Sequence, residues 1–203
     1  MMESEKIQRR LVLASASPRR ADLLRQVGLP FEAHPSGADE TRLDDEPPER
    51  YVVRLAEAKA REVLAAHPDA LVIGADTIVV LDGQVLGKPR GEQEAIDMLL
   101  SLSDRTHQVL TGLAVLSADQ TRSACVRAEV DFVAVSEATA RRYWRTGDPA
   151  DKAGGYGVQS QGGVFVRAVR GSYSAVVGLP LDVLEQMLLA YGYDTWGARC
   201  GER

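Results

Sequence analysis

Residues 70–75, ALVIGA, form a continuous apolar run, and such a run is typical of a strand that is buried on both faces of a sheet. Two further apolar segments, residues 78–81 and 84–86, follow closely. They flank Asp82-Gly83, a dipeptide that strongly favours a β-hairpin. We therefore expect a central strand at 70–75 and a hairpin directly after it.

Strands and helices alternate around this run. The elements expected before it are a strand at 10–14, a helix that Ser17-Pro18 opens and Gly28 ends, a strand at 31–34 and a long helix at 47–66. The elements expected after it are helices at 95–102, 137–146 and 181–191, β-rich segments at 106–116, 122–135 and 164–169, and a glycine-rich loop at 148–163. This order predicts an α/β fold with a mixed sheet. No linker divides the chain, so we expect a single domain over residues 1–203, with loose termini at 1–9 and 193–203.

The composition is that of an ordinary globular protein, with 203 residues of which 45% are hydrophobic and 26% charged. The net charge of −5 makes nucleic acid an unexpected partner, so an anion site must be a local basic cluster. Two cysteines, Cys125 and Cys200, do not form a disulfide framework. No apolar run is long enough to span a bilayer, and the first ten residues lack the apolar core of a signal peptide. We therefore expect a cytoplasmic protein.

The first candidate for chemistry is the segment of residues 15–20, SASPRR, where a strand runs into a helix. Arg19 and Arg20 stand in the first helical turn, where positive charge opposes the helix macrodipole. A bound anion would relieve this conflict, and the free backbone N–H groups of the turn would hold it as well. The alternative is that both arginines lie on the surface of an amphipathic helix.

Lys59 is the second candidate, because of its place on the long helix. At 100° per residue it falls near the middle of the apolar stripe, whereas Arg54 falls on the solvent face. A lysine on a buried face is costly unless it is paired or faces a cavity. A site residue is therefore the favoured interpretation, and a side chain that extends to the edge of the stripe is the alternative.

Asp76 and Thr77 follow the run 70–75 directly. In open α/β sheets ligands collect at the carboxyl ends of strands, and an aspartate there is suited to hold a divalent metal or to act as a base. Glu40, in a polar loop, supplies a second carboxylate, and two carboxylates leave room for water and phosphate oxygens around Mg²⁺. Lys88, in Gly-Lys-Pro, suits a phosphate contact. The alternative for Asp76 is a turn residue.

Two glycine-containing segments complete the set. In residues 151–159, DKAGGYGVQ, the glycines permit a close backbone approach to a ligand, and the Gln159 amide offers both a donor and an acceptor to a base. The alternative is a flexible surface loop. Residues 171–174, GSYS, bring hydroxyls to the site or form a plain turn. The three histidines are scattered along the chain, which gives little support to a zinc site or a Ser-His-Asp triad.

Taken in order, these segments resemble the Maf family of nucleotide pyrophosphatases. The matching segments are SASPRR (15–20), RLAEAKA (54–60), GADT (74–77), GKP (87–89), THQVLTG (106–112), DKAGGYGVQ (151–159) and GSYSAVVGLPL (171–181). They span nearly the whole chain. Asp104 and Ala175 depart from the family pattern, which often has Gly and Asn at these positions, but neither change removes a charged site residue.

The resemblance implies a Maf/ITPase-like fold, in which a mixed sheet flanked by helices forms two lobes around a central cleft. It implies hydrolysis of dTTP and UTP to the monophosphate and pyrophosphate, a divalent cation (Mg²⁺ or Mn²⁺), a cytoplasmic location and a homodimer. The implied site residues are Asp76 as proton acceptor, Asp76 and Glu40 for the metal, Arg19, Thr77 and Gln159 for substrate choice, and Ser15, Ser17, Arg20, Lys59 and Lys88 for phosphate. The alternatives are a 7-methyl-GTP pyrophosphatase and a non-catalytic nucleotide- or nucleic-acid-binding regulator of cell division.

Overall fold

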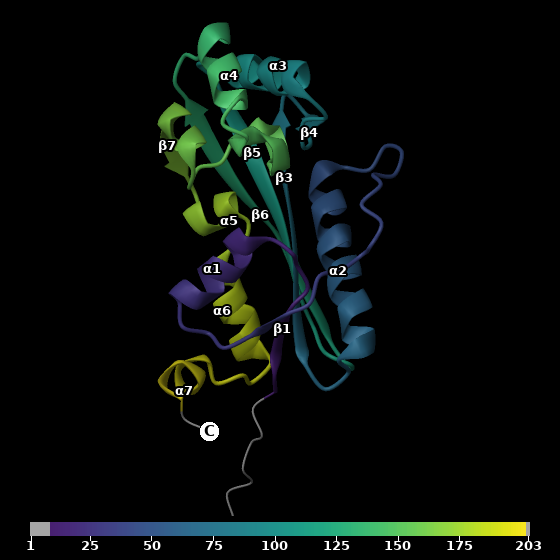
Figure 1. The fold of residues 1–203 in the computed structure, drawn as a ribbon. Coiled ribbons are helices and arrows are strands. Elements are labelled where there is room, and N and C mark those ends of the chain that lie inside the picture. Colours follow the sequence, from purple (N-terminus) through teal and green to yellow (C-terminus); the bar gives the residue numbers. More distant parts are fainter. Residues whose placement is uncertain (1–8, 202–203) are drawn as a thin grey trace, which may run out of the picture.

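The computed structural model describes residues 9–201, and in this part of the chain seven strands form one mixed sheet with helices on both faces (Figure 1). The strands are β1 (Leu11–Leu13), β2 (Glu32–Ala33), β3 (Leu71–Leu81), β4 (Gln84–Leu86), β5 (Thr106–Leu116), β6 (Thr121–Phe132) and β7 (Val166–Arg170). Their order is β2-β1-β3-β5-β6-β7, and β4 pairs with β3. The pairs of β1 with β2 and β3 are parallel and the others antiparallel, which confirms the predicted mixed sheet.

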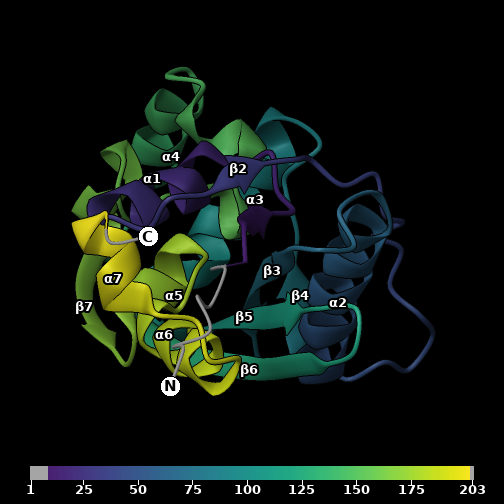
Figure 2. The same cartoon turned by 90° about the horizontal axis from the view of Figure 1, so that it is seen from below.

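The helices divide between the two faces and the two ends of the sheet. They are α1 (Pro18–Gln26), α2 (Pro48–Ala66), α3 (Glu92–Leu102), α4 (Glu137–Trp144), α5 (Tyr173–Val177), α6 (Leu181–Ala190) and α7 (Thr195–Cys200). The helix α2 covers one face, and α1, α5 and α6 lie on the other (Figures 1 and 2). One apolar core lies beneath α1 and α6 and a second beneath α3 and α4, so the long central strands join two lobes. None of the helices within residues 9–201 has the length and apolar character to cross a membrane.

The strand β3 differs from the prediction. We expected one strand at 70–75 and another at 78–81, with Asp76 at the carboxyl end of the first, but β3 runs unbroken through both. Asp76 keeps its ladder partner, Gly112 of β5, and lies in the middle of the strand. The strand that ends here is the parallel neighbour β1, which pairs with β3 only as far as Ile73. Because β4 pairs only from Val79 onward, the edge of β3 is open between these two partners.

Two glycines let α2 lie directly on the sheet. A Cβ on Gly74 would lie 2.1 Å from the backbone oxygen of Ala56, and a Cβ on Gly112 would lie 2.1 Å from that of Val52. Either methyl group would push the helix away from the strands. This close approach is what brings Lys59, one turn further along α2, within reach of Asp76 on β3.

The chain after Gly192, which we expected to be loose, is ordered as far as Gly201. Tyr193 is buried in the core beneath α6, and α7 follows it, with its first turn capped by the Asp194 side chain. Arg199 of α7 forms an ion pair of 2.7 Å with Glu185 of α6. These contacts hold the segment against α6 and the core beneath it, so the prediction of a loose terminus is wrong for residues 193–201. Of the other residues predicted to be loose, 1–8 and 202–203 lie outside the described residues, and Arg9 precedes β1 without regular secondary structure.

Candidate active site

A cavity of about 530 Å³ opens at the free edge of β3, between the two lobes. It is lined by the β1–α1 turn, by α2 and β3, and by the loops that follow β2, β4 and α4. All ten site residues expected from the sequence line it: Ser15, Ser17, Arg19, Arg20, Glu40, Lys59, Asp76, Thr77, Lys88 and Gln159. The structure therefore brings the set together, while the role of each residue stays a prediction.

Lys59 lies at the centre of the charged part of this cavity. Its Nζ is 2.7 Å from Asp76 Oδ1 and 2.6 Å from Glu40 Oε1, so one ammonium bridges two carboxylates. The residue is only 8% exposed, which confirms the prediction of a paired lysine on the buried face and excludes the extended surface conformation. Partial burial alone would raise the pKa of Glu40, but Lys59, with help from Lys88 and Arg20, outweighs it and holds that pKa below its usual value.

Arg20 joins three separate segments around the β1–α1 turn. Its guanidinium donates to the Ser15 hydroxyl at 3.1 Å, to the Thr77 hydroxyl at 3.3 Å and to the backbone oxygen of Gly178 at 2.8 Å. The surface alternative is therefore wrong for Arg20. Burial lowers its pKa, while the nearby charge of Asp76 acts in the opposite direction. The cation is thus held next to the carboxylate cluster rather than in solvent.

Ser17 occupies the N-cap position of α1, as expected, but its side chain does not cap the helix. Its backbone N–H instead donates to the Ser15 hydroxyl at 3.1 Å. The first turn of α1 therefore keeps backbone N–H groups that no side-chain cap occupies, at a point that faces the cavity. Such a helix start is suited to hold a phosphate oxygen.

Asp76 and Thr77 are neighbours in β3 but point to opposite faces of the sheet. Asp76 meets Lys59 on the α2 side, and Thr77 meets Arg20 on the α1 side. Thr77 is fixed by the Thr111 hydroxyl at 3.0 Å, which in turn donates to the backbone oxygen of Ala175 at 2.7 Å. Both side chains line one cavity because the edge of β3 is open here.

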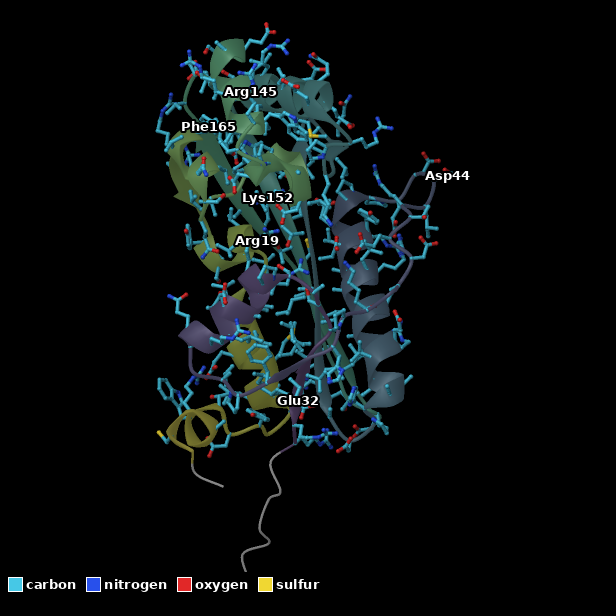
Figure 3. All side chains as sticks on the ribbon, in the orientation of Figure 1. Arg19, Glu32, Asp44, Arg145, Lys152 and Phe165 are labelled. Carbon is cyan, nitrogen blue, oxygen red and sulfur yellow. The ribbon has the colours of Figure 1, made fainter. Side chains whose placement is uncertain are left out.

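Arg19, Lys88 and Gln159 also line the cavity. Arg19 forms an ion pair of 3.0 Å with Asp151, although the two residues are far apart in the chain, and Figure 3 shows Arg19 close to Lys152 beside the central strands. Within residues 9–201 the side chains of Lys88 and Gln159 make no hydrogen bond or ion pair, and both are exposed. Their polar groups are therefore available to a ligand.

The sequence did not point to the two residues that hold Glu40 in place. Tyr51 donates to the backbone oxygen of Glu40 at 2.8 Å. Arg54 donates two hydrogen bonds, of 2.6 and 2.7 Å, to the Glu46 carboxylate and a third to the backbone oxygen of Thr41. Arg54 was placed on the solvent face of α2, and it does lie there, but the loop before α2 folds over it. The one feature of the sequence that could have indicated a role for Arg54 was its position in the RLAEAKA segment.

Two of the three histidines lie side by side in the fold, although they are far apart in the sequence. The rings of His34 and His67 lie 4.2 Å apart, centroid to centroid. His107 is buried, and its Nε2 is 2.6 Å from the hydroxyl of Tyr156, a residue of the cavity wall. Its Nδ1 is buried without a partner among residues 9–201. His107 thus anchors one wall of the cavity from behind.

Burial lowers the pKa of His107 from its ordinary value near 6.5 to about 4, against a smaller opposing effect of Asp131. Between these two pH values the unfolded chain binds a proton that the folded protein excludes, so stability is full above pH 6.5 and is lost as pH falls toward 4. A shift of this size corresponds to roughly 3 kcal/mol. The unfolding free energy of each protein can be measured by urea denaturation at pH 7.5 and at pH 4. We expect the decrease between these two pH values to be about 3 kcal/mol smaller in His107→Gln than in the parent. Equal losses in both proteins would contradict the assignment.

Comparison with known proteins agrees with this geometry. A family model described as Maf-like protein matches residues 10–191. The dTTP/UTP pyrophosphatase of Pseudoalteromonas atlantica is 48% identical over 182 residues, which cover 88% of this chain and 95% of the relative. The enzyme of the same name from Moorella thermoacetica is 48% identical over 190 residues, 93% of this chain and 98% of the relative.

Among solved structures, the Staphylococcus aureus Ham1 protein matches 62% of this chain and 72% of its own, with a TM-score of 0.44 and 16% sequence identity. The family model and the curated relatives cover far more of the chain than this partial structural match. Because both span most of its length, from the SASPRR segment to the last long helix, the chain belongs to the Maf family.

Proposed function

We propose that this protein hydrolyses UTP and dTTP to the nucleoside monophosphate and pyrophosphate. The observation that carries the proposal is the convergence of five cationic side chains and three carboxylates on one cavity between the lobes. The relatives named dTTP/UTP pyrophosphatase, at 48% identity over about nine tenths of the chain, support the choice of nucleotide.

The cationic side chains match the charge of a triphosphate. Arg20 and Lys59 are fixed by hydrogen bonds in the cavity, and the Lys88 side chain, which makes no hydrogen bond or ion pair with the described residues 9–201, lines its wall. Cations that are already oriented need no reorganisation when negative charge develops on the departing pyrophosphate. The start of α1, next to Ser15 and Ser17, adds backbone donors for the same phosphate chain.

Asp76 is the group that accepts the proton of the attacking water. Its Oδ1 is held by Lys59, and its Oδ2 makes no hydrogen bond with any of residues 9–201. One oxygen is thus fixed and the other is available to a water that attacks the α-phosphorus. The bond from the α-phosphorus to the bridging oxygen breaks, and pyrophosphate leaves with that oxygen.

A divalent cation fits the donor set of this site. Asp76 and Glu40 offer hard carboxylate oxygens on the same side of the cavity, and Mg²⁺ binds through one or two carboxylates together with substrate phosphates. The ammonium of Lys59 lies between the two carboxylates, which marks the position as one where positive charge is stabilised. A bound Mg²⁺ or Mn²⁺ would offset the charge of the phosphate oxygens.

Substrate choice is assigned to Arg19, Thr77 and Gln159. The Gln159 amide is exposed at the cavity and carries both a donor and an acceptor, which is what the edge of a uracil or thymine ring requires. Thr77 and Arg19 lie on the α1 side of the cavity, where one is fixed by Arg20 and the other by Asp151. The three residues therefore come from three segments that converge on the same ligand.

A panel of nucleoside triphosphates, scored for pyrophosphate with Mg²⁺, Mn²⁺ and chelator, tests the proposal. UTP and dTTP are expected to give the highest kcat/KM, and chelation is expected to abolish turnover. Preference for 7-methyl-GTP would move the protein to another substrate of the same chemistry. DNA binding without any hydrolysis would favour the regulator instead. Sedimentation of the purified protein tests the homodimer, and fractionation of cells tests the cytoplasmic location, which both stay predictions.

A further inference from the structure

Asp148 is a partly buried carboxylate behind the cavity wall, and it is not one of the residues that line the cavity. It lies at the start of the loop between α4 and β7, with a side chain only 13% exposed. Its Oδ2 accepts hydrogen bonds from the Tyr143 hydroxyl at 2.6 Å and the Ser160 hydroxyl at 2.7 Å. Burial alone would raise the pKa of Asp148, but these donors and Lys152 outweigh it and hold that pKa below its usual value. The group is therefore a fixed negative charge inside the wall.

Lys152 connects this charge to Arg19. Its ammonium donates to the backbone oxygen of Asp148 at 2.6 Å and lies 3.3 Å from Asp148 Oδ1. The same ammonium donates to Asp151 Oδ1 at 2.7 Å, while the other oxygen of Asp151 receives Arg19 at 3.0 Å. Negative and positive charges thus alternate along the chain of contacts, from Asp148 through Lys152 and Asp151 to Arg19. Figure 3 shows the last cation, Arg19, next to Lys152.

Ser160 connects the same carboxylate to Gln159, which precedes it in the chain. The Ser160 hydroxyl donates to Asp148, and the Ser160 backbone N–H donates to the backbone oxygen of Gly157 at 3.3 Å, so the turn that carries Gln159 is closed from within. The packing around this turn is tight, because a Cβ on Gly157 would lie 2.4 Å from the Ser160 hydroxyl and 2.7 Å from Lys152 Cε. The backbone of Gln159 has little freedom to move while these contacts persist.

We infer that Asp148 is a positioning residue for nucleobase selection, which sets the places of Arg19 and Gln159 from behind the cavity wall. The inference rests on the proposed function, in which those two residues contact the nucleotide. Asp148 itself touches no substrate. It acts through Lys152 and Asp151 on one side and through Ser160 on the other.

The charge of Asp148 is essential to this arrangement. Without it, the buried ammonium of Lys152 keeps Asp151 as its one carboxylate partner and draws closer to it, which weakens the hold of Asp151 on Arg19. Selectivity is a difference between two affinities, so small displacements of the reading groups lower it before they abolish binding. The phosphate-binding cations Arg20 and Lys59 take no part in this network, and kcat for the preferred nucleotide is therefore expected to change least.

Asp148→Asn tests the inference, with UTP and CTP as the paired ligands because they differ only at one edge of the base. We expect the ratio of kcat/KM for UTP over CTP to fall about tenfold, mainly through KM. Ser160→Ala removes a single hydrogen bond and is expected to give a smaller loss in the same direction. The matched control is Asp97→Asn, since Asp97 is exposed on α3 and, among the described residues 9–201, its side chain has a hydrogen bond only from Gln93 of the same helix; its ratio should stay at the parent value.

A second measurement separates this inference from the proposed function. The Kd values of the non-hydrolysable α,β-methylene analogues of UTP and CTP report selection without turnover, and the melting temperature of each variant reports folding. A parent protein that discriminates between the analogues but releases no pyrophosphate would overturn the proposed function alone. An unchanged UTP-to-CTP ratio in both folded variants would overturn the role of Asp148, as would a parent protein that binds the two analogues equally.

Discussion

Replacing Asp76 by Asn should lower kcat by roughly 10³-fold with saturating UTP, because proton transfer by a positioned carboxylate typically contributes 10² to 10⁴. The amide has the shape of the carboxylate and still accepts from Lys59, which lies 2.7 Å away. It does not take up the proton of an attacking water, and it is a poorer ligand for a hard cation. Lys59 also keeps Glu40 as a partner at 2.6 Å, so the folded protein should persist. Pyrophosphate release measured at saturating substrate checks the result.

The comparison variant for this loss is Asp97→Asn, the same chemical change at an exposed position on α3. Its kcat should match that of the parent within a factor of two or so, because surface substitutions away from special contacts have small effects. The Kd of the α,β-methylene UTP analogue should change much less than kcat in Asp76→Asn. A variant that retains a third or more of the parental kcat would exclude Asp76 as the proton acceptor.

The sequence predicted most elements because their boundaries carry local signals. The helix α2 was expected at 47–66 and spans Pro48–Ala66, since prolines stand at its start and just beyond its end. The strand β3 was divided wrongly, because its apolar run is interrupted by Asp76 and Thr77. Polar residues in the middle of a buried strand usually indicate its end. Here Asp76 and Thr77 lie just beyond the point where the neighbouring strand β1 ends. The end of β1 cannot be read from the local sequence of β3, because the two strands are more than fifty residues apart in the chain.

The candidate site was predictable where a residue violated a local pattern. Lys59 stands on an apolar stripe, and this contradiction alone pointed to a paired or ligand-facing side chain. Arg54, His107 and Asp148 violated nothing visible in the sequence. Their roles come from contacts made by folding: a loop covers Arg54, the ring of Tyr156 meets His107, and Lys152 and Ser160 close on Asp148. Residues that position others are therefore harder to predict than residues that face the ligand.

Lys59→Met is expected to lower kcat/KM for UTP by at least 10²-fold, since each charge-assisted hydrogen bond is worth about 1.5–3 kcal/mol. Methionine keeps the apolar stem that packs on the stripe of α2, but it leaves Asp76 and Glu40 facing each other without a shared counter-charge. It also removes a cation from the phosphate part of the cavity. Steady-state kinetics with UTP measures the loss. Arg61→Met, two residues further along the same helix with a side chain 61% exposed, is the control and should behave as the parent.

The unfolding free energy of Lys59→Met provides an independent check on the ion pair between Lys59 and Asp76. Removing one partner of a buried ion pair costs about 3 kcal/mol or more, because the other charge stays buried without compensation. Adding Asp76→Asn to Lys59→Met removes that charge, so the double variant should regain much of the lost unfolding free energy while activity stays absent. Recovery of stability without recovery of turnover would separate the structural share of the Lys59–Asp76 contact from its share in catalysis. Additive losses of stability in the double variant would mean instead that the two side chains, though 2.7 Å apart, do not interact energetically in the folded protein.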